Sequence, residues 1–405
     1  MSLLSEYEQR TSWKYEPIRG FFHTADSLKG KINQNGSYAP FPGSTVVFRL
    51  GKQCLQTVQL MQRILYDKLE GTGMLADALP ASTIHMTLHD LISPEICISQ
   101  SEEAYESEIA DSVKKAAGIA EDICKEYNGR GITMVSDRIV NMVSKSLVLM
   151  LKPQTEQDYE LLLEMYRRFD VIQKLPYSLT PHITLAYFKP GMLDGGRLGE
   201  AVDSVQINPD NAPVFEFCPE SLTVQSFLDM QIYRDLPERI CFCCDGGLNR
   251  SVMAANILNH LAKERKLPVT GEARSAYLNT QGRFVSDRVW KTLENHGITP
   301  DRTYLSARYL EDKEVSCFTG FAGISDGAME RISMLSLPED RFYNLSVFFF
   351  GVRDPEYGEI THEQAFKELY DRVEKYLDAF ETDCRKHTGR LRHGYGSVLE
   401  KTGRI

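Results

Sequence analysis

Residues 239–251 read RICFCCDGGLNRS, and this stretch decides the fold of the second half of the chain. The apolar run at 239–243 predicts a short buried strand, and the glycine-rich stretch after it predicts a loop. The sequence from Ser251 to Lys263 predicts a helix. A strand, a loop and a helix in this order bring backbone N–H groups and a helix N-terminus to one point, which attracts phosphate oxygens.

Two side chains of this stretch carry chemistry. Cys244 and Arg250 have a Cys-x5-Arg spacing. Arg250 can hold two phosphate oxygens in a bidentate pair, and the positive field of the loop favours a thiolate at Cys244. That thiolate can attack phosphorus and form a phosphocysteine. Ser251 can hydrogen-bond the sulfur. The remaining predicted phosphate-binding residues are Gly246, Gly247, Leu248 and Asn249.

The second half resembles the low-molecular-weight protein tyrosine phosphatase family over about residues 238–382. Beyond the loop, the resemblance rests on Ser275-Ala276, on Ser306-Ala307-Arg308 and on Asp354-Pro355 before a final helix. It implies a parallel α/β sheet with flanking helices. It also implies that Asp354 is the general acid, which protonates the leaving oxygen and then activates water, and that Tyr357 lines the cleft.

Departures from the family pattern bear on the substrate. Gly247 stands where the family usually has Asn, and Glu356 replaces an aromatic residue that commonly lines the cleft. The stretch 278–283 has no aromatic residue, although Tyr277 precedes it. A cleft with few aromatic residues predicts a sugar or nucleotide phosphate at least as much as phosphotyrosine.

The first half carries a repeated tetrapeptide, HMTL at 85–88 and HITL at 182–185. Both copies predict strands, in which residues i and i+2 point to one face. His85 therefore shares a face with Thr87, and His182 with Thr184. Two histidines can supply an acid and a base near neutral pH, while the threonine hydroxyls donate to phosphate oxygens. The sequence leaves open which histidine is the acid.

Two further residues accompany this pair. Tyr187 is predicted to line the same cleft. His89 shares the face of His85 if the strand continues that far, and is expected to be a supporting or a purely structural residue.

The repeated motif resembles the two-histidine phosphoesterase family, which includes the RNA ligase-like cyclic phosphodiesterases, over about residues 35–230. The matching positions are His85, Thr87, His182 and Thr184. The resemblance implies a bilobal α+β fold. It also implies hydrolysis of a 2′,3′-cyclic or related cyclic phosphate, with no metal and no cofactor.

Composition is that of a globular protein. The chain has 405 residues, of which 42% are hydrophobic, enough for two or three cores. A domain boundary is predicted near residue 235. The first domain is then 1–235, in which 1–40 are hard to assign, and the second is 236–405.

Charge and cysteine content limit the environment and the partners. The net charge of −10 argues against binding long duplex nucleic acid, but not against holding a nucleotide or a strand end in a local basic pocket. The nine cysteines look free, which predicts a reducing cytoplasm, and Cys241, Cys243 and Cys244 lack a second ligand pair for zinc. The sequence contains no run of about 18 apolar residues, so no membrane span is expected. Residues 385–392 predict a solvated, mobile tail, with contact to a nucleic-acid backbone as the alternative.

These features together predict a bifunctional phosphoesterase. The first domain would open a cyclic phosphate on a nucleotide or an RNA end, and the second would hydrolyse the resulting phosphomonoester. The alternative is a protein tyrosine phosphatase, with a phosphoprotein partner, whose first domain is a nucleotide-binding regulatory module. A sensor with decayed sites is disfavoured, because both sets of reactive residues are intact. The sequence does not indicate the oligomeric state.

Overall fold

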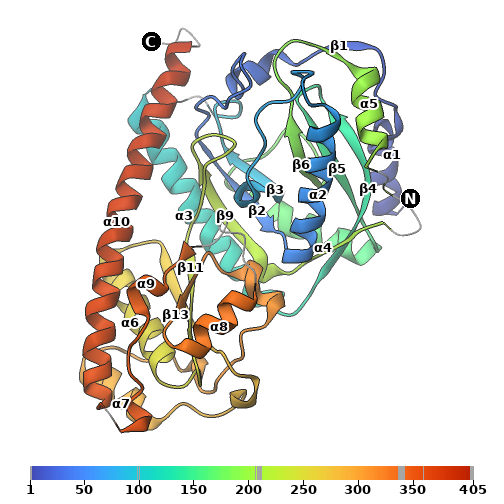
Figure 1. Ribbon diagram of the computed structural model, residues 1–405. Helices are drawn as coiled ribbons and strands as arrows, with labels where there is room; N and C mark the ends of the chain where they lie inside the picture. Colours follow the sequence, from blue (N-terminus) through green and yellow to red (C-terminus); the bar gives the residue numbers. More distant parts are fainter. Residues whose placement is uncertain are drawn as a thin grey trace. The chain divides into compact units, whose positions relative to one another are not determined.

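The computed structural model describes residues 2–97, 99, 101–205, 207, 212–335, 343–358 and 360–401 (Figure 1). The chain forms two compact units. The first comprises Met1–Asp235 together with Thr388–Ile405, and the second comprises Leu236–His387. Among the described residues, no helix is both long enough and apolar enough to cross a membrane.

An eight-stranded sheet is the centre of the first unit. Its strand order is β10-β9-β2-β3-β6-β5-β4-β8, and every neighbouring pair is antiparallel. Because β3 and β6 are the two middle strands, each half of the sheet contributes one copy of the His-x-Thr-Leu motif at the centre. The strands are β2 (Gly43–Arg49), β3 (His85–Ile92), β4 (Ile132–Met142), β5 (Ser146–Pro153), β6 (His182–Tyr187), β8 (Val214–Phe217), β9 (Leu222–Phe227) and β10 (Tyr233–Asp235).

Helices cover this sheet. α3 packs against β2 and β9, α4 packs against β3, β4 and β5, and α2 packs against β6. Start signals are local, since Ser101 caps α3 and Thr155 forms a capping box with Asp158 at the start of α4. The helices are α1 (Leu3–Arg10), α2 (Lys52–Lys68), α3 (Glu102–Glu126), α4 (Glu156–Phe169) and α5 (Gly195–Asp203).

Residues 1–40, which the sequence left unassigned, are part of this fold. Tyr7 on α1 is buried, and its hydroxyl donates to the carbonyl oxygen of Leu151 on β5 at 2.8 Å. Short elements complete the unit. They are β1 (Phe21–His23), which pairs with β7 (Met192–Asp194), and the 3-10 helices η1 (Ser12–Tyr15), η2 (Asp26–Gly30), η3 (Ala81–Thr83) and η5 (Pro219–Ser221).

The second unit contains a four-stranded parallel sheet in the order β12-β11-β13-β14. Residues of β11 alternate between its two faces, as period 2 requires. Phe242 and Cys244 belong to a core formed with α6 and α10, while Cys241 and Cys243 belong to a core formed with α8. The predicted parallel sheet with helices on both faces is confirmed. Its strands are β11 (Glu238–Cys244), β12 (Val269–Ser275), β13 (Gly320–Gly323) and β14 (Tyr343–Asn344).

The apolar run at 345–350 predicts a buried strand from its sequence, but the structure forms a short helix there, at 346–349. Asn344 accepts a hydrogen bond from the Ser346 N–H at 3.1 Å, which turns the chain out of β14. A short apolar run does not distinguish a buried strand from a buried helix, so this error is intrinsic to the pattern. The helices are α6 (Arg250–Arg265), α7 (Asp287–Asn295), α8 (Asp326–Met334), α9 (Ser346–Phe349) and α10 (His362–Lys401), with the 3-10 helices η6 (Leu278–Thr280), η7 (Arg302–Tyr304), η8 (Asp312–Cys317) and η9 (Pro355–Tyr357).

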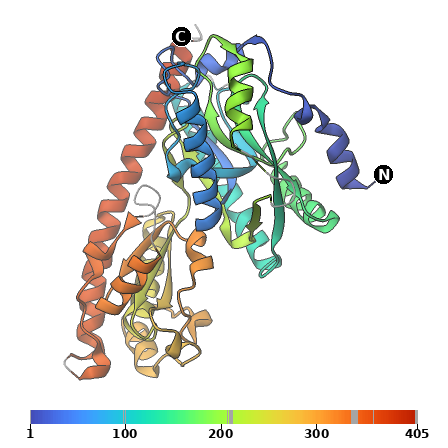
Figure 2. The ribbon, with the colours of Figure 1, turned by 45° about the vertical axis from the view of Figure 1, so that its right-hand side comes forward.

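The last helix corrects two predictions. α10 runs unbroken from His362 to Lys401 (Figure 2), so residues 385–392 are helical and not a mobile tail. From Thr388 onward the chain groups with the first unit and not with the predicted second domain. Tyr395 is the reason, because its ring is buried and stacks on Tyr105 of α3 with centroids 3.6 Å apart.

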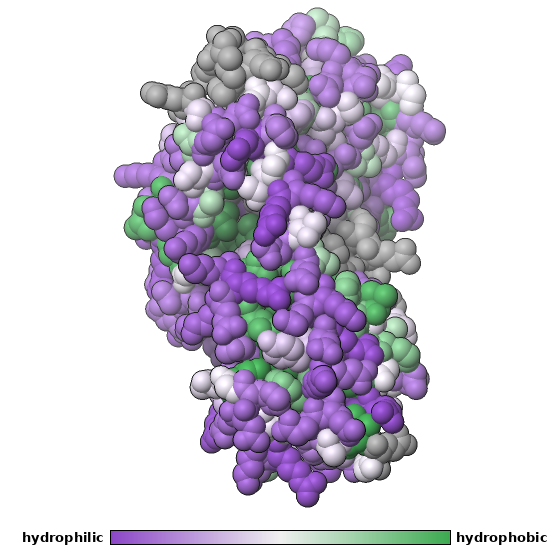
Figure 3. Space-filling model, turned by 90° about the vertical axis from the view of Figure 1, so that its left-hand side faces the viewer, coloured by the Kyte–Doolittle hydropathy of each residue, from purple (hydrophilic) through white to green (hydrophobic). Residues whose placement is uncertain are grey.

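On the face drawn in Figure 3, hydrophilic residues predominate among those coloured.

Two candidate active sites

The Cys-x5-Arg loop joins β11 to α6 in the second unit. Cys244 is the last residue of β11, and Arg250 is the first residue of α6. The sulfur of Cys244 lies 3.2 Å from Oγ of Ser251, at hydrogen-bonding distance, and both residues are buried. A serine hydroxyl in this place can donate to a thiolate, which stabilises the charge that a nucleophile needs.

The loop is held against β12. Gly247 has φ +63°, and a Cβ on it would lie 2.9 Å from the backbone nitrogen of Ser275, so only glycine fits this position. Oγ of Ser275 lies 2.8 Å from the carbonyl oxygen of Asp245, to which it can donate. The loop is therefore braced from β12, although it lacks the asparagine that the related family usually has at Gly247.

Arg250 connects the loop to Asp354. Its Nη2 lies 2.9 Å from a carboxylate oxygen of Asp354 and 2.9 Å from one of Asp245. Its Nη1 donates to the carbonyl oxygen of Val352 at 3.0 Å. Burial alone would lower the pKa of Arg250, but the neighbouring Cys244, Asp354 and Asp245 outweigh burial and raise it. The guanidinium is therefore a permanent positive charge beside the thiol.

One buried polar atom of Arg250 points to an anion. Nε of Arg250 is buried and has no hydrogen-bond partner among the residues that the structure describes. Asn249 donates to Asp354 at 3.3 Å, and Asp354 also accepts from the Glu356 N–H at 3.1 Å. A buried N–H donor usually has a hydrogen-bond partner. Because Nε of Arg250 belongs to a cationic group, a phosphate oxygen would suit it as that partner.

Three residues of this site were given no role from the sequence, namely Asp245, Ser275 and Ser325. Asp245 pairs with Arg250 and accepts from the hydroxyl of Ser325 at 2.8 Å, and Ser275 braces the loop. The position of Asp245 directly after the cysteine was the available signal. The hydroxyl of Tyr277 and a carboxylate oxygen of Asp245 both lie close to Gly327. Tyr277 is therefore beside the loop. The side chain of Tyr357, the predicted cleft residue, is outside the described part of the chain.

The four motif residues of the first unit come together at the centre of its sheet. Met86 of β3 pairs with Ile183 of β6, and this antiparallel register sets His85 beside Thr184 and Thr87 beside His182. Met86 and Ile183 are buried on one face, whereas the residues on either side of each are partly exposed on the other. The pairing thus gathers both histidines and both threonines on one face.

Each motif ends in a β-bulge at its leucine. Between β2 and β3 the ladder skips Leu88, and between β5 and β6 it skips Leu185. A bulge adds one residue to a strand and reverses the alternation after it. The third residue on the site face is therefore Asp90 in one strand and Tyr187 in the other.

His89 is consequently on the opposite face from His85. It is buried, its ring packs on Tyr166 and Phe169, and its Nε2 lies 3.3 Å from Asp170. The expectation that His89 shares the face of His85 depended on an unbroken strand, and the bulge at Leu88 makes it wrong. No local sequence pattern indicates the bulge.

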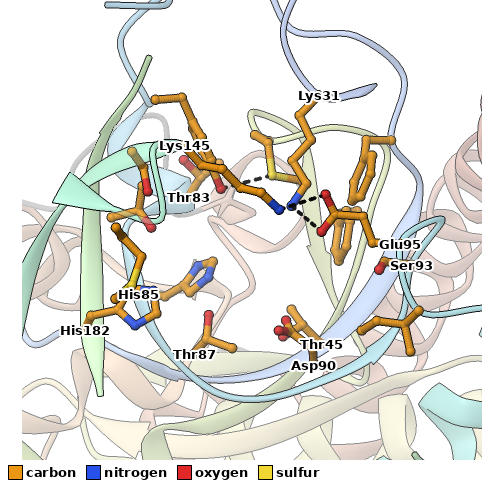
Figure 4. Close-up of a pocket in the computed structure, with 18 of the residues that line it drawn as sticks. Lys31, Thr45, Thr83, His85, Thr87, Asp90, Ser93, Glu95, Lys145 and His182 are labelled. Atoms are coloured by element: carbon orange, nitrogen blue, oxygen red, sulfur yellow. Dashed lines mark hydrogen bonds and ion pairs between the residues drawn. The ribbon is translucent and has the colours of Figure 1, made fainter. Parts of the chain in front are cut away.

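A cavity of about 500 Å³ opens over this face (Figure 4). Its volume lies in the range of pockets that hold a nucleotide-sized ligand. Aromatic side chains form one wall, with Phe41 and Phe227 stacked on each other and Tyr233 against Phe227. The predicted residues that line the cavity are His85, Thr87, His182, Thr184 and Tyr187.

The two histidines differ in their surroundings. Nδ1 of His182 lies 2.7 Å from the carbonyl oxygen of Thr180, which accepts only, so the proton is on Nδ1 and the neutral ring has its lone pair on Nε2. Burial lowers the pKa of His182, although Thr180 and Asp90 oppose the shift. The ring of His85 meets Tyr233 edge to face at 5.3 Å.

Within the described ranges, no three or more His, Cys, Asp and Glu side chains are placed to hold a metal ion. The site residues of both units are instead proton carriers, hydroxyl donors, a thiol and a guanidinium.

Comparisons with known proteins bear on the second unit. Residues 239–389 match the family model described as low molecular weight phosphotyrosine protein phosphatase. A search of curated proteins returned no match.

Several solved structures are similar to parts of the chain. YfkJ from Bacillus subtilis is 19% identical, with a TM-score of 0.32, over 36% of this chain and 96% of its own. The arginine phosphatase YwlE from Geobacillus stearothermophilus is 22% identical, with a TM-score of 0.32, over 37% and 97%. A conserved protein of unknown function from Agrobacterium tumefaciens is 17% identical, with a TM-score of 0.39, over 53% and 93%.

The residues that the family model covers include Cys244, Arg250 and Asp354. The match to 239–389 makes this part of the chain similar to the low molecular weight phosphotyrosine protein phosphatases and supports a phosphatase activity for it.

Proposed function

We propose that the chain is a bifunctional phosphoesterase. Its second unit hydrolyses phosphomonoesters through a phosphocysteine, and its first unit opens a cyclic phosphodiester on a nucleotide or an RNA end. The product of the first reaction carries the monoester that the second consumes, so the two reactions form a sequence.

The phosphatase reaction uses Cys244 and Asp354 in turn. The thiolate of Cys244 attacks phosphorus, a P–S bond forms, and the P–O bond to the leaving group breaks as Asp354 gives that oxygen a proton. The Asp354 carboxylate then takes a proton from water, which attacks phosphorus and releases phosphate and the thiolate. Arg250 and the loop N–H groups hold the three phosphate oxygens throughout. The observation that carries this half is Arg250, which follows the loop that starts at Cys244 and whose Nη2 lies 2.9 Å from Asp354.

The cyclic phosphate reaction uses the two histidines. Neutral His182, with its lone pair on Nε2, takes a proton from water, which attacks phosphorus. Protonated His85 gives its proton to the ribose oxygen that leaves, and the ring of the cyclic phosphate opens to a monoester. Thr87 and Thr184 donate to the non-bridging oxygens. The observation that carries this half is that all four side chains line one cavity.

The test combines two variants with two substrates. Wild-type protein, Cys244→Ser and His85→Ala/His182→Ala are incubated with 2′,3′-cyclic AMP and with an aryl phosphate. We expect the wild type to release free phosphate from both. Cys244→Ser should convert 2′,3′-cyclic AMP to adenosine monophosphate and release no free phosphate. The double histidine variant should not hydrolyse 2′,3′-cyclic AMP but should still hydrolyse the aryl phosphate. The reason is that loss of each acid or base group lowers the rate about 100- to 10,000-fold.

Matched controls use the same residue types away from the sites. His23→Ala on β1 and Cys54→Ser on α2 should behave as the wild type. An intact cyclic substrate with wild-type protein, alongside aryl phosphate hydrolysis, would reject the first half of the proposal. That result would favour a phosphatase whose first unit binds a nucleotide without cleaving it.

A further inference from the structure

The cavity of the first unit contains a second charged cluster that the mechanism does not use. Nζ of Lys31 lies 3.5 Å from one carboxylate oxygen of Glu95, and Nζ of Lys145 lies 3.1 Å from the other. All three side chains line the cavity. In Figure 4 both lysines point toward Glu95, away from the side of the cavity where His85 and His182 lie.

The cluster carries a net positive charge. Burial alone would raise the pKa of Glu95, but the two lysines outweigh burial and lower it, so its carboxylate is ionised. Two ammonium groups against one carboxylate leave one positive charge. Each ammonium has three N–H donors, of which Glu95 takes one. The cluster can therefore accept an anion on its cavity side.

Each lysine is held in place by its own contacts. The Nζ of Lys31 lies over the ring of Phe41, 4.5 Å from its centroid. Lys145 follows a tight turn between β4 and β5, in which its N–H donates to the carbonyl oxygen of Met142 at 2.9 Å. Both lysine side chains are largely withdrawn from solvent, with 16% and 23% exposed. Such ordered cations lose less entropy on binding an anion than exposed lysines do.

The turn before Lys145 is itself unusual. Val143 and Ser144 both have positive φ, at +45° and +58°. A β-branched residue strongly disfavours this region, and strained backbone of this kind is concentrated at ligand sites. The turn persists because Asn141 accepts from the Ser144 N–H at 3.0 Å and the Ala25 N–H donates to the Ser144 carbonyl at 3.0 Å. This conformation sets Val143 and Lys145 on the cavity wall.

We propose that Lys31 and Lys145 bind a second phosphate group of the substrate. The preferred substrate of the first unit is then a nucleotide that carries a phosphate in addition to its cyclic phosphate. This inference rests on the proposed cyclic phosphodiesterase activity, because His85 and His182 hold the scissile group while the lysines hold the other. The aromatic wall at Tyr233 and Phe227 lies in the same cavity and suits the base.

The experiment compares a substrate without a second phosphate with two substrates that carry one. The three substrates are 2′,3′-cyclic AMP, the same nucleotide with a 5′-phosphate, and a dinucleotide that ends in a cyclic phosphate. The second phosphate is a 5′-monoester in the 5′-phosphorylated nucleotide and a 5′-diester in the dinucleotide. Comparing these two substrates shows which form of phosphate the lysines bind. All proteins carry Cys244→Ser and Arg250→Ala, so that the second unit neither consumes nor captures the products.

We expect kcat/KM to be higher for a substrate with a second phosphate, and we expect Lys145→Ala to reduce this preference about tenfold or more, mainly through KM. That size corresponds to one hydrogen bond to a charged group. Glu95→Gln should increase the preference, because it removes the carboxylate that competes with the phosphate. If the cluster were only structural, both substitutions would act in the same direction. Lys152→Ala is the matched control, since Lys152 pairs with Glu8 at the other end of β5 and does not line the cavity.

Binding measurements separate this inference from the proposed activity. Calorimetry gives Kd for adenosine 2′-monophosphate and adenosine 2′,5′-bisphosphate without any turnover. Hydrolysis of all three substrates with no preference, and equal Kd values, would overturn the second phosphate site while leaving the activity in place. Tighter binding of the bisphosphate that depends on Lys145, with no hydrolysis, would support the site and reject the activity.

Discussion

Met86 lies opposite Ile183 in the ladder between β3 and β6, and this one pairing aligns the two His-x-Thr-Leu motifs at the middle of the first unit. Because the strands are antiparallel, the histidine of each motif faces the threonine of the other. The bulge at each leucine then brings Asp90 and Tyr187 to the same face. The chemistry that we propose for this unit depends on that register.

The pH dependence of cyclic phosphate hydrolysis should reflect His182. Burial lowers the pKa of His182 below the usual value of about 6.5, so the neutral ring predominates at pH 6.5 and the protonated ring at lower pH. If neutral His182 is the base, the midpoint of the acid limb of kcat/KM should lie below pH 6.5. A profile of kcat/KM against pH for 2′,3′-cyclic AMP measures this directly.

Asp90→Asn provides the matched change. Asp90 opposes the lowered pKa of His182, so its removal should shift the acid limb to still lower pH. The amide preserves the size of the side chain and can still accept from the hydroxyl of Tyr177, which lies 2.6 Å from Asp90. An acid limb above pH 6.5, or a shift to higher pH in Asp90→Asn, would assign the base role to another group.

The two glycines of the phosphate loop should respond differently to a methyl group. Gly247→Ala adds a Cβ 2.9 Å from the backbone of Ser275 at φ +63°, and the cost of the left-handed conformation alone is about 1 kcal/mol. We expect at least a tenfold loss of kcat/KM on an aryl phosphate and a lower melting temperature. Gly246→Ala meets only ordinary contacts, 3.6 Å from Leu248, and should stay within about twofold of the wild type. Equal losses in the two variants would mean that Ser275 does not set the loop conformation.

Asp354→Asn should depend on the leaving group. A general acid matters most when the leaving oxygen is basic, so the loss in kcat/KM, which reports the step that forms the phosphocysteine, should be about 100- to 10,000-fold for an alkyl or nucleoside phosphate. The loss should be much smaller for p-nitrophenyl phosphate, whose phenolate leaves without a proton. Phosphocysteine hydrolysis also needs Asp354, so rapid-quench detection of the covalent intermediate accompanies the rate measurement. The same loss for both substrates would show that Asp354 acts by holding Arg250, to which it is paired at 2.9 Å.

The sequence was most informative where chemistry and chain order coincide. The strand, loop and helix around Cys244 were all predicted, because these elements are contiguous in the sequence. The gathering of the two His-x-Thr pairs on one face followed from period 2. Both inferences use only local patterns and the rule that they impose.

The parts that were missed depend on tertiary contacts. A β-bulge at Leu88 depends on the neighbouring strand and not on the identity of the residue, so His89 was placed on the wrong face. Glu95 meets Lys31 and Lys145 only because the fold brings three distant segments to one cavity. The helix from residue 385 onward contains Gly389, Gly394 and Gly396, which weaken a helix by propensity, and packing overrides that preference.

Tyr395 tests that last point. Its ring is buried against Tyr105, and its hydroxyl accepts from the Ser99 N–H at 2.9 Å and donates to the Ser99 carbonyl oxygen at 3.1 Å. Tyr395→Ala removes a large buried aromatic group and should lower the free energy of unfolding of the first unit by about 3–5 kcal/mol. Tyr395→Phe keeps the stacked ring and should cost about 1–3 kcal/mol, because it leaves the Ser99 groups unsatisfied.

Hydrogen exchange followed by mass spectrometry resolves the effect by region. In Tyr395→Ala, peptides from α3 and from the C-terminal part of α10 should exchange faster, whereas β11 and β12 should keep their protection. His393→Ala, at an exposed position of the same helix, is the control and should leave exchange unchanged. Unaltered exchange in α3 after Tyr395→Ala would mean that the last turns of α10 fold independently of the first unit. In that case glycine content would be a better guide to this segment than the Tyr105–Tyr395 stack.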